Sequence, residues 1–319
     1  MNYFTQLFNL MVEVMLPLAL LVAVGGLWSR FFPDTPVDSA RSLLNRLVMY
    51  LFLPCILFSV ASKTPISRDL LSVPLLVGIG SLSCGAVLYA LLYRTRLGHG
   101  LADPTRAVLM VGGMFGNTFN VGAPVLVFFF GGEAIRYAVF NDMLMTMPLV
   151  WSVGVWICTR LGSHGHLEPP AVWRVMLAMP PIWAFILGTG SQQLGWNYAP
   201  LTVATGFIGQ ATIPVTLFVL GMTIPWRRLT PRPEILSAAA VKLLAAPLIV
   251  WCAAQLAYHP VGEAQLAAVV EGTTPAMVTT LLLADRFRLD SGAAALLIGW
   301  TTILFWFTLP VIMALGFIA

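Results

Sequence analysis

Ten apolar stretches follow one another along this chain, separated by short polar connections. They cover approximately residues 8–28, 40–61, 69–93, 105–130, 134–159, 172–194, 200–224, 234–257, 262–284 and 291–317. A helix of about 20 apolar residues spans the hydrocarbon core of a bilayer. Because lipid cannot hydrogen-bond to the backbone, an apolar stretch of this length folds in a membrane as a helix. The sequence therefore predicts an all-α polytopic membrane protein with ten transmembrane helices.

The composition indicates that almost none of the chain forms a soluble domain. Of the 319 residues, 59% are hydrophobic and 9% are charged, whereas soluble domains contain about 25% charged residues. We expect one integral membrane domain over residues 1–319. No basic leader with a small-residue cleavage site precedes the first apolar stretch, so we expect no removable signal peptide.

The basic residues and the cysteines need no special function. The 17 Lys and Arg lie mostly in the short connections, where membrane topology places them, so we expect no nucleic-acid partner. The four cysteines all fall in apolar stretches without metal-ligand spacing: Cys55, Cys84, Cys158 and Cys252. Free thiols packed among helices explain them better than a disulfide or a metal site. We expect no metal and no cofactor.

Positive charge predicts the orientation. If the N-terminus is outside, thirteen basic residues fall in cytoplasmic connections: Arg30, Arg41, Arg46, Arg94, Arg96, Arg106, Arg160, Arg174, Arg227, Arg228, Arg232, Arg286 and Arg288. Three fall outside, namely Lys63, Arg68 and Arg136. Cytoplasmic connections are enriched in Lys and Arg. Both termini are therefore expected outside.

The two halves of the chain, 1–165 and 166–319, resemble each other. Leu53–Phe58 in the second span aligns with Ile213–Phe218 in the seventh, and in both a proline follows eleven residues after the first one. With five spans per half, the second half enters the membrane from the opposite side. This pattern predicts an inverted repeat, which underlies several alternating-access transporters. The alternative is coincidence between two helices rich in Leu and Pro.

The fourth span of each half is interrupted by polar and helix-breaking residues. The interruptions are 116–124 (Gly-Asn-Thr-Phe-Asn-Val-Gly-Ala-Pro) and 271–275 (Glu-Gly-Thr-Thr-Pro). Backbone that leaves a helix at membrane depth must be buried in protein or line a cavity. A matched pair of interrupted spans is the best pointer in a sequence to a transporter binding site. We therefore place the substrate site where these two spans meet.

The first interruption combines an anion-binding backbone with polar side chains. Pro124 lacks a backbone donor and Gly122 loosens the turn before it. Freed amides and the positive end of the following half-helix suit an anion, and Asn117, Thr118 and Asn120 add side-chain donors and acceptors. The alternative is a proline kink satisfied by neighbouring helices.

The second interruption has similar polar and helix-breaking residues. Gly272, Thr273 and Thr274 precede Pro275, so two opposed helix ends are expected to face one pocket. In the seventh span, the polar pair Gln210 and Thr212 stands before the proline at position 214. That helix either lines the substrate path or is simply a packed helix with a kink.

Three charged residues inside spans are candidates for coupling or ion pairing: Lys242, Glu271 and Asp142. Such residues face a partner or a wet cavity. Lys242 either attracts a carboxylate substrate or pairs with Glu271, and the pairing is slightly favoured. Glu271, next to the interruption, is a candidate proton carrier. Asp142 is either a buried partner for an arginine or part of the core near the site.

These residues together resemble the auxin efflux carrier family, which includes plant PIN carriers and bacterial malate and malonate permeases. The similar segments are 117–126 and 269–275 at the interruptions, 284–290 after the second one, and 209–214 and 242–247 in spans seven and eight. The resemblance covers nearly the whole chain. Two departures from plant members are the short connection at 160–171 and Glu271, where plant members carry Gln.

The resemblance implies a fold with two inverted five-helix repeats and broken crossover helices 4 and 9, like NhaA and bile-acid symporters. It implies a scaffold and homodimer surface from helices at about 8–61 and 172–224. Helices at about 69–159 and 234–317 would form a moving transport domain. It also implies a role for Asn117 in holding a substrate carboxylate. Glu271 puts a plant-like substrate in doubt.

The sequence therefore favours a secondary transporter of small organic carboxylates, such as malonate, malate or an auxin-like acid, working by an elevator motion. Proton or sodium coupling is possible, and the expected location is the inner (plasma) membrane of a bacterium. Alternatives are a sodium-coupled bile-acid-type symporter and a membrane sensor that binds a ligand without transport. No Walker loop, HExxH or nucleophile elbow is present, so we do not expect an enzyme.

Overall fold

The computed structural model describes residues 3–32, 34, 36–162, 171–196 and 198–317. Within these ranges the chain is helical, without strands and with one isolated antiparallel bridge between Gly116 and Ala276. Seven helical segments are long and apolar enough to cross a membrane: Thr5–Trp28, Val37–Ala61, Arg68–Arg94, Gly132–Leu161, Ala199–Arg228, Pro233–Ala257 and Ser291–Ala314. These segments confirm the prediction of an all-helical polytopic membrane protein.

Three of the ten expected spans are not single long helices. The expected spans 105–130, 172–194 and 262–284 consist of shorter helices separated by breaks. The ten-helix count and the inverted repeat therefore stay predictions. The predicted boundary between the repeats, at 165, lies outside the described residues.

The first half of the chain contains the elements from α1 to α10. Their bounds are α1 Tyr3–Asn9, η1 Leu10–Met15, α2 Leu16–Phe31, α3 Val37–Leu47, η2 Val48–Phe52, α4 Leu53–Ala61, α5 Arg68–Arg94, η3 Arg96–Gly98, α6 Asp103–Met114, η4 Thr118–Gly122, α7 Ala123–Phe130, η5 Gly132–Ala134, α8 Ile135–Asn141, η6 Asp142–Thr146, α9 Met147–Leu149, η7 Val150–Gly154 and α10 Val155–Leu161. Several η elements are π-helical turns inside one continuous helix, as in the run from α8 to α10.

The second half contains the elements from α11 to α19. Their bounds are α11 Val172–Leu177, α12 Pro180–Gln193, α13 Ala199–Gly209, α14 Thr212–Thr223, η8 Trp226–Arg228, α15 Pro233–Ala240, η9 Val241–Ala245, α16 Ala246–Ala257, α17 Glu263–Gly272, α18 Thr279–Arg286 and α19 Ser291–Ala314. Local chemistry sets several helix starts. The Asp290 carboxylate accepts the Ala293 amide at 2.9 Å, and the Ser67 hydroxyl caps α5 in the same way.

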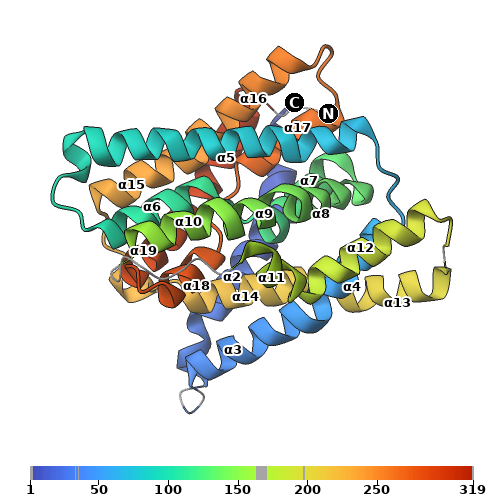
Figure 1. Cartoon of the computed structure of the whole chain (residues 1–319), viewed down its shortest axis with the longest axis horizontal. Helices are drawn as coiled ribbons and strands as arrows, with labels where there is room; N and C mark the ends of the chain where they lie inside the picture. The colour runs from blue at the N-terminus through green and yellow to red at the C-terminus, as the bar shows by residue number, and fades with distance from the viewer. Residues whose placement is uncertain (1–2, 33, 35, 163–170, 197, 318–319) are drawn as a thin grey trace.

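The helices pack in two groups (Figure 1). The first helix group is α2, α3, α4, α12, α13 and α14, in which α14 packs on α2 and α12 and α13 pack on α4. The second helix group is α5, α6, α10 and α15 to α19, in which α17 packs on α5 and α16, and α6 packs on α5, α10 and α19. Elements η4 and α8 contact both groups, which places the first interruption between them.

The outer surface is apolar where a membrane would contact it. Large hydrophobic side chains are exposed on helices of both groups, including Phe207 on α13, Leu256 on α16 and Phe307 on α19. A soluble monomer rarely exposes apolar surface on this scale. Lipid is the solvent that makes such a surface favourable, so the exposed side chains agree with the membrane assignment.

Candidate functional site

The two interruptions lie directly against each other. Helix α6 ends at Met114 and the chain becomes helical again at Thr118, while α17 ends at Gly272 and α18 begins at Thr279. The Asn117 amide donates to the Pro275 carbonyl at 2.7 Å, and the Met277 amide donates to the Phe115 carbonyl at 3.3 Å. Each break thus satisfies backbone groups of the other, which is how irregular backbone persists inside a membrane protein.

The first break ends in a half-helix that runs over Thr118–Phe130. Its first amides have no acceptor one turn earlier in the chain, and the helix dipole makes this end positive. Asn117 stands immediately before it as the N-terminal boundary residue and is 6% exposed. Gly122 and Pro124 lie inside this half-helix rather than in the break. The break itself is therefore several residues earlier than Pro124.

A cavity of about 150 Å³ opens at the start of this half-helix. The wall from the interruptions and the helices beside them consists of Gly116, Asn117, Thr118, Phe119, Asn120, Asp142, Met147, Met277, Val278, Thr279 and Leu282. The opposite wall consists of Asn45, Val48, Met49, Leu53, Thr212, Thr216 and Val219 from α3, η2, α4 and α14. The cavity thus lies between the first helix group and the interrupted helices.

Asn117 presents a free donor to this cavity. Its Oδ1 accepts from Asn120 Nδ2 at 3.0 Å, and Asn120 Oδ1 accepts from the Thr216 hydroxyl at 2.6 Å. Among the described residues, no acceptor lies within hydrogen-bond distance of Asn117 Nδ2. The chain of contacts orients both amides and leaves the Asn117 donor unpaired at the wall of the cavity.

Asp142 lies in the same wall. Thr118 donates to its Oδ1 at 2.7 Å, and the carboxylate is 7% exposed. In the described ranges no arginine lies within 4 Å of Asp142, which instead lines the cavity. The cavity therefore contains one acid beside its donors.

Lys242 does not form the expected pair with Glu271. No ion pair between them within 4 Å occurs in the described part of the chain. Instead the Lys242 ammonium donates to the Gly272 carbonyl at 2.9 Å, at the last residue of α17. The negative end of a helix favours a cation, so the geometry makes Lys242 a cap for α17 rather than a wall of the cavity.

Glu271 is buried behind the half-helix. The side chain is 1% exposed, and neither carboxylate oxygen has a hydrogen-bond partner among the described residues. A Cβ placed on Gly122 would lie 2.8 Å from Glu271 Oε2, so the carboxylate packs on the Gly122 backbone. A water-sized void of about 10 Å³ adjoins Glu271, Lys242 and Thr118.

The remaining predicted residues are not in the cavity wall. Thr273 and Thr274 are fully buried, and their hydroxyls donate to the carbonyls of Val270 and Glu271 within α17. Pro275 contributes its backbone carbonyl, which accepts the hydrogen bond from the Asn117 amide. Gln210 lies in the turn between α13 and α14 with an exposed side chain.

Sequence reasoning missed two polar residues of the opposite wall, Asn45 and Thr216. Thr212 and Thr216 stand four residues apart and therefore on one face of α14. The four-residue spacing of these threonines, just after Gln210, could have indicated a polar face on this helix.

Comparisons with known proteins agree with a transporter. The family described as membrane transport protein matches residues 10–313. An uncharacterized transporter of Methanocaldococcus jannaschii is 26% identical, with 96% of this chain and 98% of the relative covered. One of Methanothermobacter thermautotrophicus is 27% identical, with 86% and 88% covered. A protein of Rhizobium meliloti, named "Putative malonate transporter", is 26% identical, with 91% of each covered.

The match extends over almost the whole chain and includes both interruptions and the walls of the cavity. The predicted resemblance is thereby confirmed at the level of the family, whose members among these relatives are named as transporters and not as enzymes. This chain is an integral membrane protein that belongs to the membrane transport protein family, the auxin efflux carrier family.

Proposed function

We propose that this protein is a secondary transporter of small organic carboxylate anions that binds its substrate in the cavity beside Asn117. The observation that carries the proposal is the pairing of the free Asn117 amide donor with the positive end of the half-helix Thr118–Phe130 in one buried cavity. Backbone amides at a helix start and a side-chain amide are donors that suit a carboxylate. The relative named for malonate supports this substrate class.

The size of the cavity favours a small acid. A volume of about 150 Å³ holds on the order of five waters at about 30 Å³ each. Drug-sized ligands occupy pockets of about 300–1,000 Å³. A short dicarboxylate such as malonate or malate therefore suits the cavity better than a bile acid, which favours the carboxylate carrier over a bile-acid-type symporter.

Transport requires the cavity to open to each side in turn. Its two walls come from different helix groups, with Thr212 and Thr216 on α14 facing Asn117 and Asn120 on the interrupted span. In the proposed elevator motion, the first helix group stays fixed as a scaffold. The second helix group moves with the two interruptions and the bound anion. The Asn120–Thr216 hydrogen bond, at 2.6 Å, would break and reform in each cycle.

Asp142 gives a reason to couple the anion to a proton. An anion in the cavity would lie beside the Asp142 carboxylate, and like charges repel strongly where water is scarce. Taking up a proton together with the anion removes this repulsion. Glu271 has no hydrogen-bond partner among the described residues and lines a small void together with Thr118, which makes it a second candidate carrier. A proton neutralises the acid directly, so the proton is the coupling ion of this proposal.

The test is uptake of labelled malonate, malate and indole-3-acetate into proteoliposomes, with and without a pH gradient and a sodium gradient. We expect saturable uptake of a dicarboxylate that a pH gradient drives. Asn117→Ala removes the free donor and should weaken binding about tenfold, the effect of about 1.4 kcal/mol. The matched control is Gln210→Ala, because Gln210 is exposed outside the cavity, and it should keep normal uptake.

Three outcomes would contradict parts of the proposal. An equal loss of uptake in Asn117→Ala and Gln210→Ala would mean that the cavity is not the substrate site. Saturable binding without uptake would indicate the sensor. Uptake that a sodium gradient drives and a pH gradient does not affect would rule out the proton as the coupling ion.

A further inference from the structure

A second and larger pocket lies outside the candidate site. It has a volume of about 660 Å³ and is lined by Ala23, Gly25, Gly26, Leu27, Trp28, Arg30, Val37, Gly221, Met222, Ile224, Pro225, Trp226, Arg227 and Arg228. These residues come from the C-terminal half of α2, the start of α3, the end of α14 and η8. The candidate membrane spans Thr5–Trp28 and Ala199–Arg228 both end here. The pocket therefore lies at a membrane–water boundary, where lipid headgroups are found.

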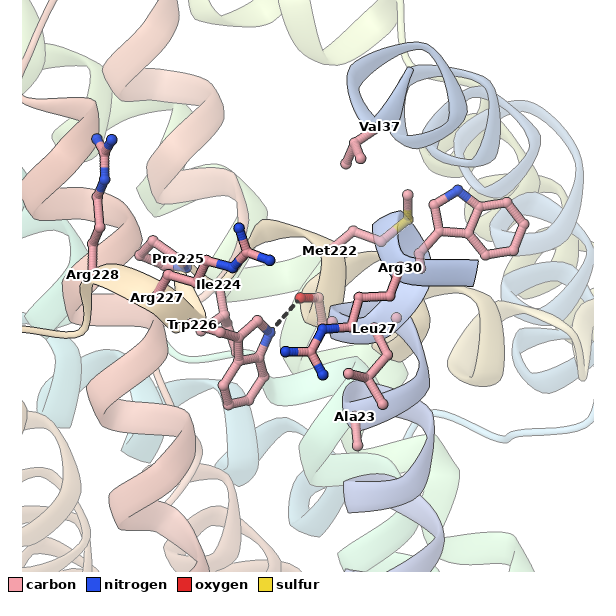
Figure 2. A pocket seen from close by; sticks show the side chains of 14 residues that line it. Ala23, Leu27, Arg30, Val37, Met222, Ile224, Pro225, Trp226, Arg227 and Arg228 are labelled. Atoms are coloured by element: carbon pink, nitrogen blue, oxygen red, sulfur yellow. Dashed lines mark hydrogen bonds between the residues drawn. The ribbon is translucent and has the colours of Figure 1, made fainter. Parts of the chain in front are cut away.

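The mouth of this pocket is positively charged. Arg30 on α2 and Arg227 on η8 extend toward the same space from opposite sides, while Arg228 points away (Figure 2). No acidic side chain is among the lining residues, and none of the three arginines has an acid within 4 Å in the described ranges. Two uncompensated guanidinium groups facing one space attract an anion, and their planar fork matches phosphate oxygens.

Much of the remaining lining is apolar and includes Leu27, Val37, Met222 and Ile224 (Figure 2). Trp226 also belongs to the lining, and its Nε1 donates to the Gly221 carbonyl at 2.9 Å (Figure 2). Trp28 lines the pocket as well, and its buried Nε1 has no acceptor among the described residues. Tryptophan at this depth is typical of the interface between acyl chains and headgroups.

We propose that this pocket binds an anionic phospholipid of the cytoplasmic leaflet. The phosphate lies between Arg30 and Arg227, and the upper part of an acyl chain packs on Leu27, Val37, Met222 and Ile224. The distribution of basic residues along the chain places this side of the membrane in the cytoplasm, where anionic lipids are enriched and basic pockets between helices bind their headgroups. A free phosphate would satisfy the arginines but would leave the apolar part of the pocket empty.

Native mass spectrometry of the full-length protein in detergent tests this proposal, because it reads bound lipid and oligomeric state together. The probes are phosphatidylglycerol, phosphatidylcholine and inorganic phosphate. We expect one or more retained phosphatidylglycerol molecules per chain, at an occupancy well above that of phosphatidylcholine. The double variant Arg30→Gln with Arg227→Gln should bind phosphatidylglycerol on the order of tenfold more weakly, since each basic residue near anionic lipid contributes appreciably.

The matched control is Arg94→Gln with Arg96→Gln. It removes the same charge from exposed arginines that the sequence places on the same side of the membrane, outside the pocket, and should keep the wild-type affinity. A second pair, Arg30→Lys with Arg227→Lys, keeps the charge but not the planar fork and should lose affinity only in part. If the Gln variant fails to fold, the Lys variant still tests whether the two arginines bind the lipid.

Each contrary result has a definite meaning. Equal loss of lipid in the control would mean non-specific attraction to the charged face. Displacement of the lipid by millimolar inorganic phosphate would mean a site for free phosphate. A dimer that excludes lipid, and that the Arg30→Gln with Arg227→Gln variant dissociates, would mean that a second copy of the chain covers the pocket. Any of these results overturns the proposal and leaves the proposed carboxylate transport untouched.

Discussion

At the scale of single residues, glycine sets how closely the two interruptions approach. A Cβ added to Gly116 would meet the Thr274 hydroxyl and would lie 2.9 Å from Lys242 Cε. A Cβ on Gly122 would meet the Glu271 carboxylate. The neighbours of Gly116 are not free to move, because Thr274 and Lys242 are held by hydrogen bonds to α17. The close contact of the two breaks therefore depends on Gly116.

Gly116→Ala should accordingly destabilise the site. Overpacking of this kind costs about 1–3 kcal/mol, and it would also push the two breaks apart. We expect a lower apparent melting temperature in detergent and weaker malonate binding. Gly132→Ala is the control, because a Cβ there meets nothing within 4 Å. A Gly116→Ala protein with unchanged binding would show that the breaks tolerate separation.

Glu271 is the residue whose role in coupling can be separated from its role in folding. Glu271→Gln keeps the shape of the side chain but cannot carry a proton. If Glu271 rather than Asp142 carries the proton, we expect a folded protein that still exchanges substrate across the membrane but no longer concentrates it in response to a pH gradient. Glu13→Gln, which replaces an exposed acid of the first span, should retain driven uptake. Full concentrative uptake by Glu271→Gln would exclude Glu271 as the proton carrier.

At the scale of elements, the ends of the broken helices need partners that a continuous helix does not need. Helix α17 ends inside the protein at Gly272, and its last carbonyl receives the Lys242 ammonium from η9. On the other side, Ala276 donates its amide to the Thr301 hydroxyl of α19 at 3.1 Å. The second break is therefore held by its neighbours in the second helix group, as the proposed elevator motion requires.

Replacing Lys242 by methionine tests this capping role. Hydrogen bonds to charged groups contribute roughly 1.5–3 kcal/mol, so Lys242→Met should lower the free energy of unfolding by about that amount. Substrate affinity of the folded fraction should not change, because Lys242 is not in the cavity wall. Thermal denaturation and binding measured on the same sample give both values, with the exposed Lys63→Met as control. A large loss of affinity at full stability would instead place Lys242 in substrate binding.

At the scale of the whole molecule, alternating access requires the two helix groups to move past each other. The groups meet where α19 approaches the end of α14. A Cβ on Gly299 would lie 3.2 Å from Cγ2 of Ile224. Within the first helix group, a Cβ on Gly206 of α13 would lie 3.7 Å from the Ser59 Cβ on α4. The first pair bridges the two groups, and the second does not.

These two pairs make a matched test of the elevator motion. In a protein without native cysteines, Gly299→Cys with Ile224→Cys should form a disulfide on oxidation and stop uptake, and reduction should restore it. Gly206→Cys with Ser59→Cys should cross-link near the usual Cβ separation of about 3.8 Å and leave uptake intact. Normal uptake with the first pair oxidised would exclude relative motion at this contact.

The sequence by itself determined that this chain is helical, lies in a membrane and has two interrupted spans. These properties follow from local composition, since apolar length forces a helix in lipid and Gly and Pro act on the backbone where they stand. The polar residues from Asn117 to Asn120 were found because their polarity is unusual at membrane depth.

Only the tertiary structure decided which groups face one another. It brought Asn117 against Pro275, turned Lys242 toward the Gly272 carbonyl instead of Glu271, and left Gln210 on the surface. It also placed Thr216 in the cavity wall. Side-chain direction on a helix depends on how the helix is rotated and shifted against its neighbours. The rotation and the shift of each helix are fixed by packing across the whole molecule, so they cannot be read from a local stretch of sequence.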